Sequence, residues 1–267
     1  MTDMTDTQAG SVPSSRTLPV TPDHYRAGPV DLSILDTIAW DRLDRGPGRT
    51  PPQDLIRAMV TADDDDWDGL LWSDLADEVM NQGTCYPVTP AVVSVLAELA
   101  GSVALSGRRR LDLHMDLLAI GGRALYDQVA DAEEGLAPQV DEWTAAAHAA
   151  VGAAVPALLA HWDEQPPAVQ FALAILAGLY PVQGASAVAQ ISRFAGEYRG
   201  TEPGAYVNLA LALLAGDDAA TLSVARDITE WDEEVDADWL NLLGLPVRVT
   251  CAHLMRLGAM IIATNHD

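Results

Sequence analysis

A chain of 267 residues can form one large domain or two small ones with an ample core. Hydrophobic residues make up 49% of the chain but aromatic residues only 6%, which predicts closely packed helices of Ala, Leu and Val and argues against a large sheet. The 39 acidic residues outnumber the 15 basic residues, all of them Arg, for a net charge of −24. The lack of Lys excludes a lysine Schiff base and a P-loop lysine, and the charge disfavours a nucleic-acid partner.

Residues 1–28 are rich in Thr, Ser, Pro and Asp, which predicts a disordered tail. The segment has neither the basic region nor the apolar region of a secretory signal, so we expect a cytoplasmic protein with reduced cysteines. The longest apolar stretch, 145–160, is mostly Ala and contains His148 and Pro156. We therefore expect no membrane span and no membrane partner.

Residues 29–62 are expected to form N-terminal capping helices. Leu32, Leu35 and Ile38 share one face at helical spacing. The stretch DRGPGRTPPQ then interrupts the pattern, and a short helix over 54–60 is expected to follow it.

The stretch DDDDWDG, residues 63–69, has the D-x-D-x-D-G opening of a calcium loop if it is counted from Asp64. Such a loop needs a bidentate acid at its twelfth position, where this chain has Leu75. We therefore interpret Asp66 as the N-cap of a helix that starts at Trp67, and we expect no metal site.

Residues 63–267 are expected to form one domain of helical repeats. Gly83 is predicted to end one helix in a left-handed conformation, and Thr89 with Pro90 to begin the next. No alternating strand pattern lasts long enough to count. Later helices are predicted over 109–131, 139–162, 166–180, 185–198, 203–215, 218–231 and 246–263.

Three of these predicted helices begin with Pro, a few small residues and then Val, at Val169, Val207 and Val247. The pattern thus recurs about every 40 residues, and each of these helices follows another one. A single amphipathic pair cannot bury its own apolar face, so stacked pairs are expected to share a continuous core.

This pattern resembles the HEAT-repeat family, whose second helices commonly open D-x-x-V-R, and the likeness is closest at Pro246, Val247 and Arg248. The segment WDGLLWSDLADEVMNQGTCYPVTPAVVSVLAELA is similar to the opening module of bacterial HEAT-repeat-like proteins, with Asn81 where they often have His. The resemblance covers residues 66–262 and implies an all-α fold, an α-α superhelix of stacked antiparallel pairs. It also implies a binding scaffold, since only a few members are lyases or glycosylases.

The remaining polar residues give no catalytic prediction, and no cofactor is expected. The six His form no H-E-x-x-H motif. His114 and Asp116 would point to different faces of one helix, so we interpret His114 as packed and hydrogen-bonded, and His161 as a charge at a helix C-terminus. The three arginines at 108–110 are expected to pair with acids such as Asp112, or else to hold an anion.

Two functions remain open. The first is a non-enzymatic scaffold that binds a protein partner along its concave face, as an inhibitor or immunity-type protein or as part of an assembly. The charge of −24 favours a basic partner. The second is a small-molecule enzyme of a biosynthetic pathway, in which a carboxylate and a His act as acid and base in a groove of the solenoid.

The candidate binding residues come from two places. The first is the second helix of each repeat, and the second is the acidic segment EWDEEVDADW, which is either a solvated loop with one buried Trp or a landing site with an aromatic anchor. The candidates are Gln170, Asn208, Arg248, His253, Arg256, Trp231 and Trp239.

Overall fold

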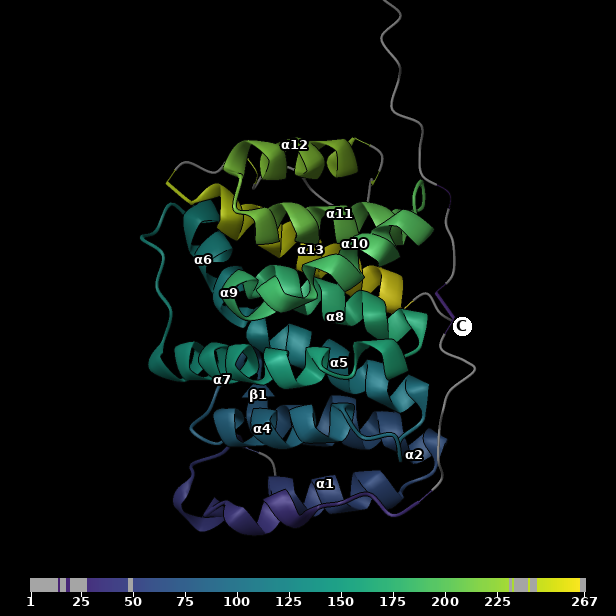
Figure 1. Cartoon of the computed structure of the whole chain (residues 1–267). Helices are drawn as coiled ribbons and strands as arrows, with labels where there is room; N and C mark the ends of the chain where they lie inside the picture. The colour runs from purple at the N-terminus through teal and green to yellow at the C-terminus, as the bar shows by residue number, and fades with distance from the viewer. Residues whose placement is uncertain are drawn as a thin grey trace, which may run out of the picture.

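The computed structural model describes residues 14, 18–19, 28–47, 50–230, 232, 240 and 244–264. Within these ranges the protein is all-α apart from one short hairpin. Figure 1 shows the helices stacked in successive levels, from α1 at one end to α12 at the other.

The α-helices of the described ranges are α1 (Pro52–Thr61), α2 (Asp64–Gly69), α3 (Ala76–Val79), α4 (Thr89–Ala100), α5 (Gly107–Gly121), α6 (Arg123–Glu133), α7 (Glu142–Leu159), α8 (Pro167–Leu179), α9 (Pro181–Gly184), α10 (Val188–Glu197), α11 (Glu202–Ala215), α12 (Asp218–Thr229) and α13 (Val247–Thr264). A π-helical stretch, Leu70–Leu75, joins α2 to α3. Short 3₁₀ turns are Ser33–Thr37, Trp40–Arg42, Trp162–Glu164 and Ala185–Ala187.

The helices form two layers that share one core. In one layer α4 packs against α7, and in the other α5 packs against α8 and α8 against α11. Small residues allow the close approach that the composition predicted: a Cβ at Gly178 of α8 would lie 2.8 Å from the Cβ of Ala210 of α11. The core is accordingly rich in Ala, Leu and Val.

Side-chain caps fix several helix starts. The Asp63 carboxylate accepts from the Asp66 backbone N–H, so α2 begins at Asp64. The prediction that Asp66 is the cap was therefore wrong, because the acid run itself enters the helix. Asp141 and Asp217 cap α7 and α12 in the same way.

The hairpin replaces the helix end that was predicted at Gly83. Helix α3 already stops at Val79, and β1 (Met80–Asn81) pairs antiparallel with β2 (Thr84–Cys85). Gln82 and Gly83 form the two-residue turn with φ of 50° and 81°. The left-handed conformation of Gly83 is confirmed, but it serves a turn and not a helix C-terminus.

The helix predicted over 109–131 is broken in two. Helix α5 ends at Gly121 and α6 begins at Arg123, with Gly122 between them. The other predicted helices from 139 onward are confirmed to within a few residues, except that the 185–198 segment starts as a 3₁₀ turn and the 218–231 helix ends at Thr229.

The N-terminal residues are less helical and more buried than predicted. The first predicted capping helix is a pair of 3₁₀ turns, whereas α1 confirms the second. In the predicted tail, Leu18 is fully buried in the core, and the carbonyl of Pro19 accepts from the backbone N–H of Ala168. Ser14 forms a parallel bridge with Thr201. The rest of residues 1–27 lies outside the described ranges.

The last helix contacts helices that are distant in sequence as well as its sequence neighbours. Helix α13 packs against α11 and α12, as the final member of a stack should, but also against α8, α6 and α5. Figure 1 shows it in yellow behind α10 and α11. A strictly one-dimensional repeat would confine each pair to adjacent repeats, so α13 ties the end of the chain to its middle.

Candidate functional site

The structure brings together the three helices that carry the predicted binding residues, because α8, α11 and α13 are mutual neighbours. Their side chains have different surroundings. The Gln170 amide donates to the Trp162 carbonyl at 3.0 Å, while Asn208 is exposed on α11. Trp231 and Trp239 lie outside the described residues.

Arg248 connects the start of α13 to the turn between α11 and α12. Its Nε donates to the Asp218 carboxylate at 2.8 Å, and its Nη2 donates to the Gly216 carbonyl at 2.7 Å. Gly216 has a left-handed φ of 74° and ends α11. Arg248 thus stabilises the C-terminal end of α11.

His253 and Arg256 are both buried on α13. The ring of His253 lies 6.0 Å from that of Tyr126, and burial, with the charge of Arg256, lowers the His253 pKa to about 4. Arg256 donates to the carbonyls of Leu118 and Ala119 at the end of α5. These side chains hold α13 against α5 and α6, and neither presents itself to solvent.

The arginines at 108–110 all have partners within the protein. Arg108 pairs with Asp112 at 3.0 Å, as predicted. Arg109 lies over the Trp67 ring and pairs with Asp64, and the buried Arg110 donates to Gln165 at 2.6 Å. Aspartates thus neutralise Arg108 and Arg109, Arg110 is buried with a neutral amide as a partner, and the described contacts support packing within the protein and not anion capture.

His114 confirms its predicted role as a packed side chain. It is 1% exposed, and its Nδ1 lies 2.7 Å from the Arg110 carbonyl, one turn earlier in α5. Burial lowers the pKa of His114 to about 4, so the ring is neutral at pH 7. Burial also raises the pKa of the Cys85 thiol, which argues against a thiolate nucleophile there.

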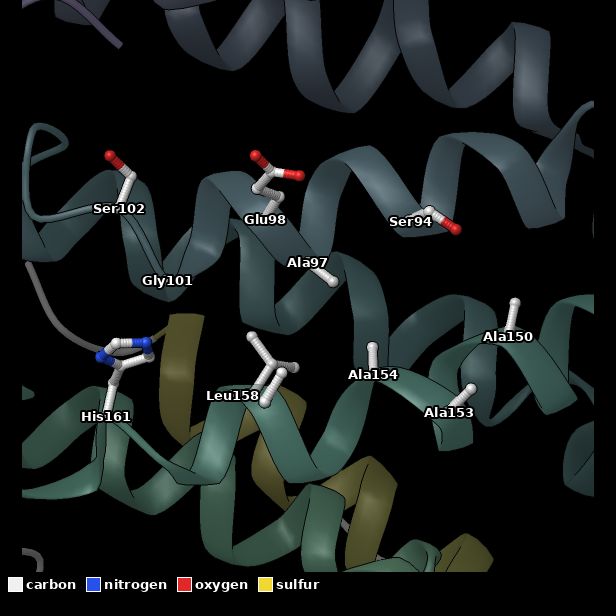
Figure 2. A pocket seen from close by; sticks show the side chains of 11 residues that line it. Ser94, Ala97, Glu98, Gly101, Ser102, Ala150, Ala153, Ala154, Leu158 and His161 are labelled. Carbon is white, nitrogen blue, oxygen red and sulfur yellow. The ribbon is translucent and has the colours of Figure 1, made fainter. Parts of the chain in front are cut away.

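A groove runs between α4 and α7 on the outside of the stack. It encloses about 500 Å³ and its floor is formed by small side chains. Figure 2 shows the methyl groups of the two helices facing each other, with Leu158 near one end. The floor residues are Ala97, Gly101, Ala150, Ala153, Ala154 and Ala157.

The rim of this α4–α7 groove is polar. Glu98 is exposed on α4, and Ser94 and Ser102 lie on either side of it. His161 closes the end of the groove, with its Nδ1 3.5 Å from the Glu164 carboxylate. The arrangement is an apolar trough with a negatively charged edge.

Sequence reasoning missed this groove, although a signal existed. The positions 150, 153, 154 and 157 follow helical spacing and all carry Ala. The stretch 145–160 was interpreted only as too weakly apolar to span a membrane. Only the structure places these alanines in a groove between α4 and α7 that, among the described residues, no third helix lines.

No protein family model matches the chain, nor does any curated protein or solved structure. The likeness to HEAT-repeat proteins therefore stays a prediction. No helix in the described ranges has the length and apolar character that a bilayer crossing requires. In the same ranges no three His, Cys, Asp or Glu side chains cluster as metal ligands.

Proposed function

We propose that this protein is a non-enzymatic scaffold, a HEAT-like α-solenoid that holds a basic protein partner. The α4–α7 groove carries the proposal. Its alanine floor offers apolar contact without long side chains that would have to be ordered on binding. The concave-face residues of the sequence prediction support it less, because Gln170, Arg248 and Arg256 already have partners in the protein.

The small side chains on the floor of the groove suit a helix of the partner. An amphipathic helix that lays its apolar face into a groove is a common recognition mode. Alanine side chains permit its backbone to approach closely, and Glu98 would pair with a basic residue beside the apolar face. The charge of −24 would draw such a partner in at low ionic strength.

The alternative, an enzyme acting on a small molecule, draws less support from the same groove. Its histidine, His161, is 47% exposed and paired with Glu164. The floor is open and offers only methyl groups, whereas an enzyme site usually encloses its substrate among converging polar groups.

The test is capture of a partner from the native host with two matched variants. Ala153→Arg adds a positive side chain at an exposed position of the groove, whereas Ala145→Arg adds the same charge to α7 outside it. We expect wild type and Ala145→Arg to retain the same protein at low salt, and Ala153→Arg to lose it. Equal capture by all three forms, or no retained protein under any growth condition, would contradict the proposal.

A further inference from the structure

A second apolar cleft lies on another part of the molecule, between the π-helical stretch, α5 and the end of α13. It encloses about 320 Å³. Its apolar wall consists of Trp72, Leu111, Met115, Met260 and Ala263. We call this the Trp72 cleft, because Trp72 lies at its edge and is 41% exposed.

The π-helical stretch separates two tryptophans with different surroundings. Trp67 is buried, and its Nε1 donates to the Asp112 carboxylate at 3.1 Å. Trp72 follows within Leu70–Leu75, where the wider π turn changes the rotation per residue and leaves this ring at the cleft. Such stretches are rare within helices and recur at functional sites.

A row of acids leads up to the cleft. Asp65, Asp68 and Trp72 follow one another at spacings of three and four, so they lie along one side of the helix. Both aspartates are exposed, and among the described residues neither has an ion-pair partner. Arg108 and Asp112 form the polar wall of the cleft, and they neutralise each other in an ion pair at 3.0 Å.

The row also reaches close to the cleft itself. Burial raises the pKa of the Asp112 carboxyl, and the charge of Asp68 adds to that effect. Asp68 directly follows Trp67, whose Nε1 donates to the Asp112 carboxylate at 3.1 Å, so its backbone lies next to a residue that contacts the wall. Two exposed carboxylates, Asp65 and Asp68, thus lie on the helical run that leads to an apolar pocket whose own charged lining residues pair with each other.

We propose that the Trp72 cleft takes one bulky apolar side chain of a basic polypeptide segment, whose Lys or Arg residues pair with Asp65 and Asp68. The proposal deepens the proposed function and rests on it for the kind of partner. The cleft volume is at the low end for a drug-sized ligand and suits a single side chain. Burial of the apolar side chain would supply most of the affinity. Asp65 and Asp68 would select segments that carry basic residues next to that side chain.

The length of the acid row favours a polypeptide over a small molecule. Asp65 and Trp72 are seven residues apart, which is about 10 Å along a helix. A molecule that fills the cleft would not reach Asp65, whereas an extended chain covers this distance in about three residues. The basic residues should therefore stand two and three positions from the apolar anchor.

The probe is a synthetic peptide, acetyl-KKSLSKK-amide, with two matched controls. Acetyl-KKSGSKK-amide lacks the apolar anchor, and acetyl-EESLSEE-amide reverses the charge. The readout is the methyl NMR signal of ¹³C-labelled methionines in the full chain. Met115 and Met260 report on the cleft, while the buried Met59 and Met255 serve as internal references.

We expect the leucine peptide at about 1 mM to shift the Met115 and Met260 signals and to leave the references in place. Asp65→Asn combined with Asp68→Asn should weaken this binding by about fivefold or more, because two exposed ion pairs are lost. Trp72→Ala should abolish the shifts, and the reference signals will show whether that variant remains folded.

Several results would overturn the proposal. These are no shift at about 1 mM, an equal shift with the glycine or the acidic peptide, or movement of the two signals on dilution without peptide, which would assign the cleft to a second copy of the chain. Ala153→Arg should leave peptide binding unchanged. A partner that depends on Ala153 but a peptide that does not bind would leave the proposed function standing and remove this inference alone.

Discussion

Arg256 lies directly against Gly122, at the point where α5 ends and α6 begins. Its Nε donates at 3.2 Å to the Leu118 carbonyl, which also accepts from the backbone N–H of Gly122, and its Nη2 donates to the Ala119 carbonyl, so a side chain of the last helix adds hydrogen bonds at the end of α5. A Cβ on residue 122 would overlap the Cδ and Nε of Arg256. Glycine at this position therefore leaves the space through which α13 caps α5.

Gly122→Ala should destabilise the protein by about 1–3 kcal/mol, because the added methyl group must displace the buried Arg256 side chain. The backbone φ of −85° is ordinary, so crowding alone causes the loss. Urea unfolding measures it. Gly196→Ala is the control, since a Cβ there has open space in α10 and should be neutral or stabilising by about 0.5–1 kcal/mol. Equal effects of the two changes would refute the capping contact.

Gly83→Ala should cost about 1 kcal/mol for the left-handed backbone and a further amount for crowding, since its Cβ would overlap the Arg123 guanidinium. Gly135→Ala separates the cost of the left-handed backbone from the cost of crowding. That residue has a similar φ of 72° but nothing within 4 Å of its Cβ. Thermal or urea unfolding should give a larger loss for residue 83 than for residue 135. If both losses agree, Arg123 does not pack on the hairpin turn.

Leu18→Ala should lower the free energy of unfolding by about 2–4 kcal/mol, because Leu18 is fully buried and its truncation would leave a cavity. Leu136→Ala, at a position 55% exposed, should stay within about 0.5 kcal/mol of wild type. Denaturant titration compares the two. A neutral Leu18→Ala would restore the original view of this segment as a tail without stabilising contacts.

His114 should make the fold sensitive to acid. Its pKa is lowered to about 4 in the folded state, so below its ordinary value of about 6.5 the unfolded chain binds a proton that the folded chain does not. The free energy of unfolding therefore falls as pH drops from about 6.5 to 4, by up to about 3 kcal/mol from this group.

His114→Gln removes that contribution and should flatten the fall in stability between about pH 6.5 and 4. Urea unfolding at several pH values provides the measurement, with His161→Gln as the control at a half-exposed position. Burial acts in the opposite direction on Asp112 and Asp116, whose pKa values it raises. The comparison of variant with wild type cancels these carboxyl groups, and an unchanged slope would contradict a neutral, buried His114.

Local signals explain why most helices could be predicted. Pro near the first turn of α8 and α11, Asp141 and Asp217 as caps, and apolar spacing of three and four all act within a few residues of the element that they define. The break at Gly122 had a local sign in two adjacent glycines. The Arg256 side chain that occupies the space beside Gly122 lies far along the chain and has no local signature.

The candidate site was harder to predict for the same reason. Arg248 and Arg256 were chosen as residues of the concave face formed by the second helices, but both donate to backbone carbonyls of distant turns. Conversely, the floor of the α4–α7 groove is mostly alanine. Alanine has no charged or reactive group, so such residues do not mark a functional site in a sequence. Whether an alanine face is covered depends on the number of helices packed around it, and single-sequence patterns do not specify that number.

The contact of α13 with α5 also has a consequence for the order in which the protein can be completed. A chain is synthesised from its N-terminus, so α5 and α6 leave the ribosome long before Val247–Thr264 does. Until α13 arrives, the end of α5 lacks the Arg256 donor, although Gly122 already donates to the Leu118 carbonyl, and α6 lacks its contacts with α13. The early levels of the stack can form during synthesis, but the packing of α5 and α6 in the middle of the molecule is completed last. Damage to the C-terminal helix should therefore destabilise the α5–α6 region first.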